Sequence, residues 1–386
     1  MNSHQFEADE GRTVFHCCGL IPLIFATSIM NQLELRGKAT LVLEKPTTWA
    51  IGSKIGDDYF DVMEIFLDRS AWKQVLEIEY ESLFFSFHDI AFWPKALSID
   101  IRVMKRPLEF RRAISHLTAQ LSNTRICYVS DNVKIWKKIY PRSSRLIYIE
   151  HGVSSYNIRD NKVSIKTKIK DFLGGVFQKD IAGDPECIFF PIFHKKEKLH
   201  DEAIRTLPRF GEQAHKHKVQ EIFRFVLTRL EKENGIIFGE LKKLREVGKG
   251  KQIIFYLPTP LVRDDEYQEF LQLQLSEQGP EDKLFVIKPH PNDTNRSYLR
   301  LFLEMGFECF EFDSNAAKSL PVEFLIHVFE HSKTFGSPSS SHFYSYFWHS
   351  RVPDITPGTA ELAPLIDSEY GGSNKILSKF LSDNYS

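Results

Sequence analysis

The sequence of 386 residues contains little cysteine, almost no net charge and no long hydrophobic run. Its five cysteines form no C-x-x-C pair, which argues against a disulfide framework and against a zinc ribbon. The formal net charge of −1 excludes a uniformly basic nucleic-acid-binding protein and an acidic disordered chain. We therefore expect no nucleic-acid partner.

Apolar segments near the amino terminus are too short to serve as membrane anchors. The first residues, MNSHQFEADEGR, are acidic rather than basic, and the apolar segment at residues 17–26 contains Pro22. Neither feature is typical of a signal peptide, and a run of about ten residues is too short for a membrane span. We expect a cytoplasmic protein, and peripheral attachment to the inner membrane stays open.

Hydrophobic and aromatic residues are plentiful. The sequence is 42% hydrophobic and includes 32 phenylalanines, which favours well-packed interiors over an exposed apolar face. At roughly 100 to 200 residues per domain, the length predicts two domains.

Short β-branched runs alternate with longer helical patterns. A strand at residues 13–18, a helix at 22–32 and a strand at 39–44 form a βαβ unit, whose parallel strands need a helical crossover. Further strands are predicted at 125–130, 145–150, 252–257, 284–288 and 333–336. Their apolar composition and spacing are typical of parallel sheets that are covered on both faces.

The pattern changes to charged amphipathic helix over residues 212–247, followed by Gly248-Lys249-Gly250. We place the domain boundary there. The prediction is an α/β protein with two Rossmann-like doubly wound domains, residues 1–247 and 248–360, and a tail at 361–386 that packs back on the first domain. Two such domains facing each other enclose a cleft at the carboxyl ends of their strands, where ligands of these sheets bind.

Three polar clusters follow predicted strands. Glu150-His151-Gly152 sets a carboxylate before a glycine turn and is a candidate general base, against the alternative of a satisfied turn carboxylate. In Lys288-Pro289-His290-Pro291, two prolines stiffen the backbone around a histidine that suits proton or phosphate chemistry. Gly336-Ser337-Pro338-Ser339-Ser340-Ser341 opens a helix and suits a phosphate, although ordinary helix capping also uses serine.

Together these clusters resemble the motifs of bacterial sialyltransferases of the two-domain GT-B architecture. They are most similar to the capsular polysialyltransferases of glycosyltransferase family 38, whose pattern is an acidic-acidic-Gly motif, then His-Pro, then Ser-Ser. Here the motifs are Glu150-His151-Gly152, His290-Pro291 and Ser339-Ser340-Ser341, in that order. The middle position of the first motif departs from the family, because His151 replaces a carboxylate and leaves Glu150 as its sole acidic residue.

The resemblance implies an inverting, metal-independent sialyltransferase that uses no cofactor and moves sialic acid from CMP-sialic acid to a sialylated glycan. An α-2,8-type polysialyltransferase of capsule biosynthesis is the implied activity, with association with the inner membrane or a capsule complex left open. It implies Glu150 as base and His290 as acid, and Glu323, which follows Leu320-Pro321-Val322, as the ribose ligand, although a first-turn glutamate also simply complements the helix dipole. The implied donor-binding residues are Gly152, Pro258, Lys288, Pro291, Glu323, Ser339, Ser340 and Ser341.

Charge is unevenly distributed along the first half of the chain. Residues 57–81 carry eight acidic residues, whereas residues 102–145 carry eleven lysines and arginines against two acidic residues, a local charge of +9. A basic stretch of this kind attracts a polyanionic glycan or an anionic lipid surface, unless it only solubilises exposed helices. The acceptor-binding candidates in it are Lys134, Lys137, Lys138 and Arg142.

Three other functions stay open. His327-Val328-Phe329-Glu330-His331 matches the H-x-x-E-H spacing of a zinc peptidase, if both histidines share one helical face. Another GT-B transferase could use CMP-Kdo or a different nucleotide sugar with the same motifs. A non-catalytic glycan-binding protein of capsule assembly would bind no CMP.

Overall fold

The computed structural model describes thirteen segments of the chain, which are residues 11–45, 57–78, 84–86, 102–104, 107–130, 138–149, 187–189, 212–258, 271–272, 275–276, 278–288, 297–336 and 340–349. They belong to two compact units. Unit 1 contains the described residues up to 189 except 57–66, and unit 2 contains residues 57–66 together with those from 212 onward.

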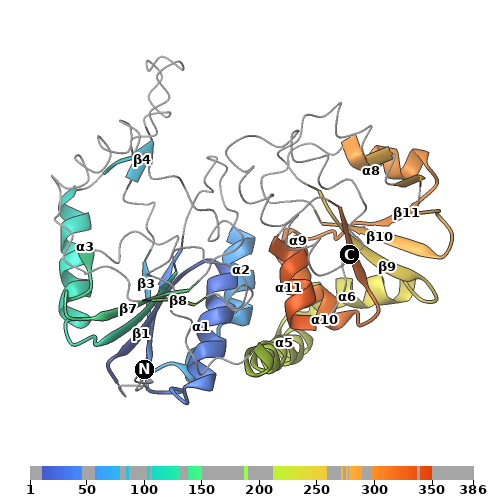
Figure 1. Ribbon diagram of the computed structural model, residues 1–386. Coiled ribbons are helices and arrows are strands. Elements are labelled where there is room, and N and C mark those ends of the chain that lie inside the picture. The colour runs from blue at the N-terminus through green and yellow to red at the C-terminus, as the bar shows by residue number, and fades with distance from the viewer. Residues whose placement is uncertain are drawn as a thin grey trace, which may run out of the picture. The chain divides into compact units, whose positions relative to one another are not determined.

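Unit 1 is built on a parallel sheet with the strand order β3-β2-β1-β6-β7-β8. Its strands are β1 (Thr13–Cys18), β2 (Thr40–Glu44), β3 (Gln74–Ile78), β6 (Ile126–Ser130), β7 (Arg145–Ile149) and β8 (Cys187–Phe189). The other elements are α1 (Leu20–Gln32), the 3₁₀ helix η1 (Arg69–Ala71), the antiparallel pair β4 (Phe84–Ser86) and β5 (Arg102–Met104), and α3 (Pro107–Gln120). Helices α1 and α3 cover opposite faces of the sheet (Figure 1).

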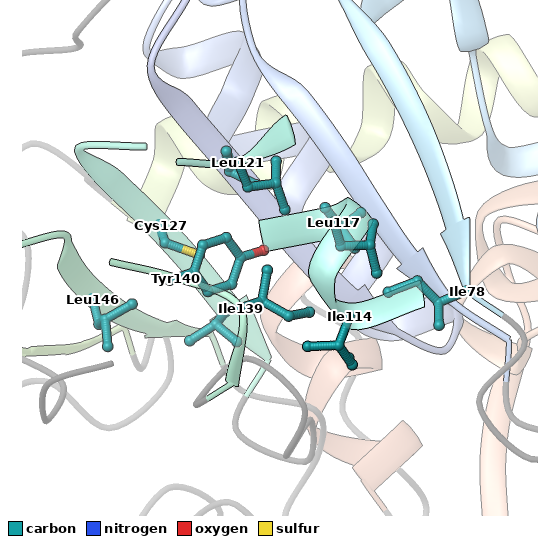
Figure 2. Close-up of a cluster of buried hydrophobic side chains, with 11 residues drawn as sticks. Ile78, Ile114, Leu117, Leu121, Cys127, Ile139, Tyr140 and Leu146 are labelled. Atoms are coloured by element: carbon teal, nitrogen blue, oxygen red, sulfur yellow. The ribbon is translucent and has the colours of Figure 1, made fainter. Parts of the chain in front are cut away.

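The α3 face of this sheet carries an apolar core. Figure 2 shows α3 side chains, among them Ile114 and Leu117, packed with Cys127, Tyr140 and Leu146. All of these side chains are buried. The alternation of side chains along each strand brings them to this one face.

Unit 2 contains a parallel sheet with the order β11-β10-β9-β12. Its strands are β9 (Gln252–Leu257), β10 (Lys283–Ile287), β11 (Glu308–Phe310) and β12 (Lys333–Gly336). Its helices are α2 (Asp57–Phe66), α5 (Glu212–Glu233), α6 (Gly235–Val247), α8 (Ser297–Glu304), α9 (Asn315–Ser319), α10 (Val322–Val328) and α11 (Ser340–His349). Rings dominate its core, where Phe285 contacts Phe302 and Phe307 at centroid distances of 4.9 and 5.1 Å.

Both sheets reverse their strand order beside the first strand of the unit, between β1 and β6 and between β9 and β12. This reversal defines a doubly wound sheet and marks the usual ligand-binding position at the carboxyl ends of the strands. The predicted α/β class with two Rossmann-like domains is confirmed. Each described strand that the sequence predicts also agrees with the structure to within one residue at either end.

The predicted boundary after residue 247 differs from the structure, which assigns α5, α6 and also α2 to unit 2. Phe66 of α2 packs against Phe223 of α5 and Phe324 of α10, with ring centroids 6.3 and 5.5 Å apart. Arg229 of α5 donates from Nη1 to the carbonyl oxygen of Glu64 at 2.8 Å. These contacts attach α2, a segment from early in the sequence, to unit 2. A single boundary position in the sequence cannot describe such a division.

The predicted tail at 361–386 lies outside the described residues. Within the described part of the chain, no helix combines the length and apolar character needed to cross a bilayer.

Candidate functional site

The carboxyl edge of the unit 2 sheet brings together residues from three of the sequence motifs. Lys288 directly follows β10, Glu323 lies in the first turn of α10, and Ser341 lies in the first turn of α11. The Ser341 hydroxyl donates a hydrogen bond to the Glu323 carboxylate, and Lys288 interacts electrostatically with the same carboxylate. Positions 288, 323 and 341 are far apart in the sequence, so the fold creates this cluster.

Lys288 is buried although it is a lysine. Its backbone N–H donates to the carbonyl oxygen of Tyr256 at 3.0 Å, which extends the pairing of β10 with β9. Its Nζ donates to the carbonyl oxygen of Lys318 at the end of α9. Burial lowers the pKa of Lys288 to about 7, against the opposing effect of Glu323. The ammonium group therefore has the Lys318 carbonyl oxygen as a hydrogen-bond partner and the Glu323 carboxylate as an electrostatic partner.

Glu323 is also buried, with 3% of the residue exposed. Pro321 is the N-cap of α10 in an extended conformation, at φ −65° and ψ 140°, and the helix starts at Val322, one residue before Glu323. Burial raises the pKa of the Glu323 carboxyl group, while hydrogen bonds from its own backbone N–H and from Ser341, together with Lys288, act in the opposite direction. The result is a fixed hydrogen-bond acceptor at the carboxyl edge of the sheet.

Gly336 allows β12 to lie close to β9 at the carboxyl edge of the sheet. It ends β12 opposite Leu257, with φ at 123°. A Cβ atom at this position would lie 2.5 Å from the carbonyl oxygen of Leu257, so a larger residue would push β12 away from β9. In the first turn of α11, Nδ1 of His342 lies 2.8 Å from Oγ1 of Thr334 and ties the helix to β12.

The remaining candidate residues of unit 2 divide into two groups. Pro258 is buried directly after β9, and Ser340 is the first residue of α11. His290, Pro291 and Ser339 lie outside the described residues.

Four candidate residues from earlier in the sequence, Glu150, Gly152, Lys134 and Lys137, likewise lie outside the described residues. Lys138 is partly buried, and its carbonyl oxygen accepts a hydrogen bond from Thr118 at 3.5 Å. Arg142 is exposed three residues before β7 begins, which places it near the amino edge of the sheet. The structure therefore does not bring Arg142 to the carboxyl edge.

Sequence reasoning missed a buried polar chain in unit 1. His16 lies within β1 and Glu44 ends β2, and their side chains contact each other, with Tyr140 on the other side of the imidazole. The sequence feature that could have indicated this chain is a histidine and a glutamate at inward positions of otherwise apolar strands.

The H-x-x-E-H segment does not form the single helical face that a zinc peptidase requires. Helix α10 ends at Val328, so His327 is its second-to-last residue and the exposed His331 lies in the turn beyond it. Among the described residues, no group of three or more histidine, cysteine or acidic side chains is placed to hold a metal ion.

The far end of α11 is anchored on α5 by a buried histidine. Nε1 of Trp348 donates to Nε2 of His215 at 3.1 Å, and Gln220 donates to the carbonyl oxygen of Trp348 at 3.1 Å. Burial lowers the pKa of His215 from 6.5 to about 3. His215 is therefore the neutral acceptor that Trp348 needs.

Acid is expected to weaken unit 2 through His215. The unfolded chain binds a proton at this residue below its ordinary pKa of 6.5, whereas the folded protein does so only near 3. The free energy of unfolding should therefore fall as pH drops from 6.5 towards 3, by about 2 kcal/mol between pH 7 and pH 5. Urea unfolding followed by tryptophan fluorescence measures this loss. His215→Gln keeps an acceptor for Trp348 and should lose clearly less between the two pH values; an equal loss would contradict the assignment.

No protein-family model matches the sequence, and no curated protein matches it. Similar solved structures include the UDP-GlcNAc 2-epimerase of Neisseria meningitidis, at 12% identity and a TM-score of 0.42, covering 96% of this chain and 100% of that one. A sialyltransferase of Photobacterium damsela has 12% identity and a TM-score of 0.39, with coverages of 94% and 80%. A trehalose 6-phosphate synthase of Burkholderia multivorans has 12% identity and a TM-score of 0.41, with coverages of 97% and 91%. At these identities and scores the likenesses carry no argument about activity.

Proposed function

We propose that the protein is an inverting sialyltransferase of the GT-B type that transfers sialic acid from CMP-sialic acid to a sialylated glycan, with α-2,8 polysialyl transfer in capsule biosynthesis as its specific activity. The observation that carries the proposal is the cluster of Lys288, Glu323 and Ser341. Ser341 belongs to the Ser-Ser motif, Lys288 lies two residues before the His-Pro motif, and Glu323 is the ribose ligand that the resemblance implies. The three interact at the edge where doubly wound sheets bind ligands.

Unit 2 is the donor-binding unit in this proposal. The Glu323 carboxylate accepts hydrogen bonds from the ribose hydroxyls of CMP, and Ser341 holds that carboxylate in place. The hydroxyl and backbone N–H groups of Ser339 and Ser340 bind the phosphate where α11 begins, because the first turn of a helix has free N–H groups and partial positive charge. Lys288 compensates the buried charge of Glu323, so the site tolerates a carboxylate beside an anionic donor.

Unit 1 binds the acceptor and supplies the base. Glu150 removes the proton from the attacking hydroxyl group as that oxygen bonds to the anomeric carbon, which inverts the configuration. The bond from the anomeric carbon to the phosphate oxygen breaks, and His290 donates a proton or a hydrogen bond to the departing CMP. Transfer requires no divalent metal here, because His290 and the serine groups donate to the phosphate in its place.

The basic stretch at residues 102–145 supplies the attraction for an anionic acceptor. Its charge of +9 favours a polysialic chain over a neutral glycan, and the attraction should weaken as salt screens it. Peripheral binding to the inner membrane or to a capsule complex would use the same charge.

Incubation with CMP-sialic acid and short labelled sialosides tests the proposed activity. The expected result is a ladder of elongated products that forms equally in the presence of EDTA. Absence of any product, or elongation with CMP-Kdo alone, would contradict the proposal.

A further inference from the structure

Unit 1 contains a chain of hydrogen-bonded polar side chains inside its core. The Tyr140 hydroxyl lies 2.9 Å from Nδ1 of His16, and Nε2 of His16 lies 2.9 Å from Oε1 of Glu44. Tyr140 and His16 are fully buried, and 6% of the Glu44 side chain is exposed. Figure 2 shows the Tyr140 ring among apolar side chains of the α3 face, with Cys127 beside it.

The donors of this chain point towards Glu44. Burial, followed by the neighbouring Cys127, raises the pKa of Tyr140 well above its ordinary value. Its phenol therefore stays protonated and can donate a hydrogen bond to Nδ1 of His16. In the tautomer that has Nδ1 as the acceptor, the imidazole carries its hydrogen on Nε2 and donates to Glu44. The carboxylate of Glu44 is the terminal acceptor, and Oε1 is the atom that His16 holds.

Glu44 lies where a ligand of this sheet would bind. It is the last residue of β2 and pairs with Cys18, the last residue of β1. The strand order reverses between β1 and β6, so the carboxyl end of β1 borders the switch point of the unit. Tyr140 and His16 are fully buried, whereas 6% of the Glu44 side chain is exposed, and Glu44 lies at the carboxyl end of β2.

A purely structural role explains this arrangement poorly. The surrounding cluster is apolar, and apolar side chains of similar volume would fill the same space without the cost of burying a carboxylate. A Tyr–His–carboxylate chain does what apolar packing cannot, because it fixes the orientation of the terminal carboxylate.

We propose that Glu44 is a sugar-binding residue of unit 1, which accepts a hydrogen bond from a hydroxyl group of the acceptor glycan through Oε2. His16 and Tyr140 are positioning residues that act through Glu44. The assignment of the sugar as acceptor rests on the proposed function. A carboxylate selects a hydroxyl-bearing face of a sialic acid unit and repels its carboxylate, so this contact complements the basic stretch, which attracts the charge of the glycan.

The test is calorimetric titration of the full-length protein with a trimer of α-2,8-linked sialic acid, in the absence of donor. Glu44→Gln keeps an oxygen that accepts from His16 but loses the charge, and should weaken trimer binding about tenfold. Tyr140→Phe removes only the hydroxyl and should weaken it about threefold. Tyr128→Phe is the matched control. Tyr128 is a buried tyrosine of the same sheet, stacked on Phe15 with ring centroids 4.7 Å apart, and it is not one of the three residues Tyr140, His16 and Glu44.

The salt dependence of trimer affinity distinguishes the contribution of Glu44 from that of the basic stretch. The loss caused by Glu44→Gln should be the same at low and high salt, whereas the affinity of every variant falls with salt. Unchanged trimer affinity in Glu44→Gln and Tyr140→Phe, with lowered melting temperatures, would overturn the proposal and leave a structural role. Lack of trimer binding by the parent protein would also overturn it, and if Glu44→Gln does not fold, Tyr140→Phe decides the question.

A separate titration with CMP keeps the two proposals distinguishable. The Glu44 variants should bind CMP as the parent protein does, since the proposed donor site lies in unit 2. Failure of CMP to bind the parent protein, with Glu44-dependent trimer binding intact, would refute the transferase and retain the sugar site.

Discussion

Glu150→Gln is expected to lower sialyl transfer by roughly 10²- to 10⁴-fold while CMP affinity stays within about twofold. The amide keeps the size of the side chain but cannot take a proton from the attacking hydroxyl group, and the proposed donor site belongs to the other unit. Initial rates at saturating CMP-sialic acid, together with calorimetric CMP binding, measure the two quantities.

His151 provides the control for this experiment, because it occupies the position where the polysialyltransferase pattern has a second acidic residue. His151→Ala should retain most of the activity. If Glu150→Gln kept near-normal turnover, Glu150 would not be the base, and a large loss in His151→Ala would assign that role to the histidine.

Glu323→Gln is expected to weaken CMP binding by roughly 10- to 100-fold. A glutamine at this position has one acceptor oxygen where the carboxylate has two, and it leaves the buried Lys288 ammonium group without its compensating charge. The pKa of Lys288 should then fall further, because burial is already the main cause of its lowering. Calorimetry with CMP gives the affinity, and thermal melting shows whether the fold is retained.

Glu330→Gln is the matched control for Glu323→Gln. Glu330 is exposed just beyond the end of the same helix and lacks the contacts of Glu323, so its substitution should leave CMP affinity unchanged. Equal affinities of the Glu323 and Glu330 variants would remove Glu323 from the donor site.

Much of the fold could be predicted because its strands are apolar runs bounded by polar residues. The segments at 13–18 and 252–257 match β1 and β9 in full. The three-residue strands were missed, among them β8 and β11, because so short a run carries no period of its own. Pairing with a neighbouring strand creates such elements, and pairing is not visible in a single segment.

The predicted domain boundary after residue 247 differs from the structure for a related reason. Sequence order suggested that the charged helices at 212–247 closed the first domain. In the structure, however, α5 packs on α2, α10 and α11, and α6 packs on α5 and α9, all in unit 2. Amphipathic periodicity shows that a helix buries one face without showing which partner covers it.

In the candidate site, the sequence identified residue types and positions but not their contacts. Lys288 and Ser341 were singled out because each lies at the end of a strand or the start of a helix. That Lys288 also donates to the carbonyl oxygen of Lys318 depends on packing between α9 and β10, which no motif records. His16 and Glu44 escaped notice because a polar residue inside an apolar strand has no fixed spacing to its partner.

The central claim is that unit 2 binds a cytidine nucleotide at the cluster of Lys288, Glu323 and Ser341. Calorimetric titration of the full-length protein with CMP, UDP and GDP under identical conditions tests it most directly. We expect clear binding of CMP, weaker or no binding of UDP and GDP, and loss of the CMP signal in Glu323→Gln. Binding of UDP or GDP in preference to CMP, or binding of none of the three, would contradict it.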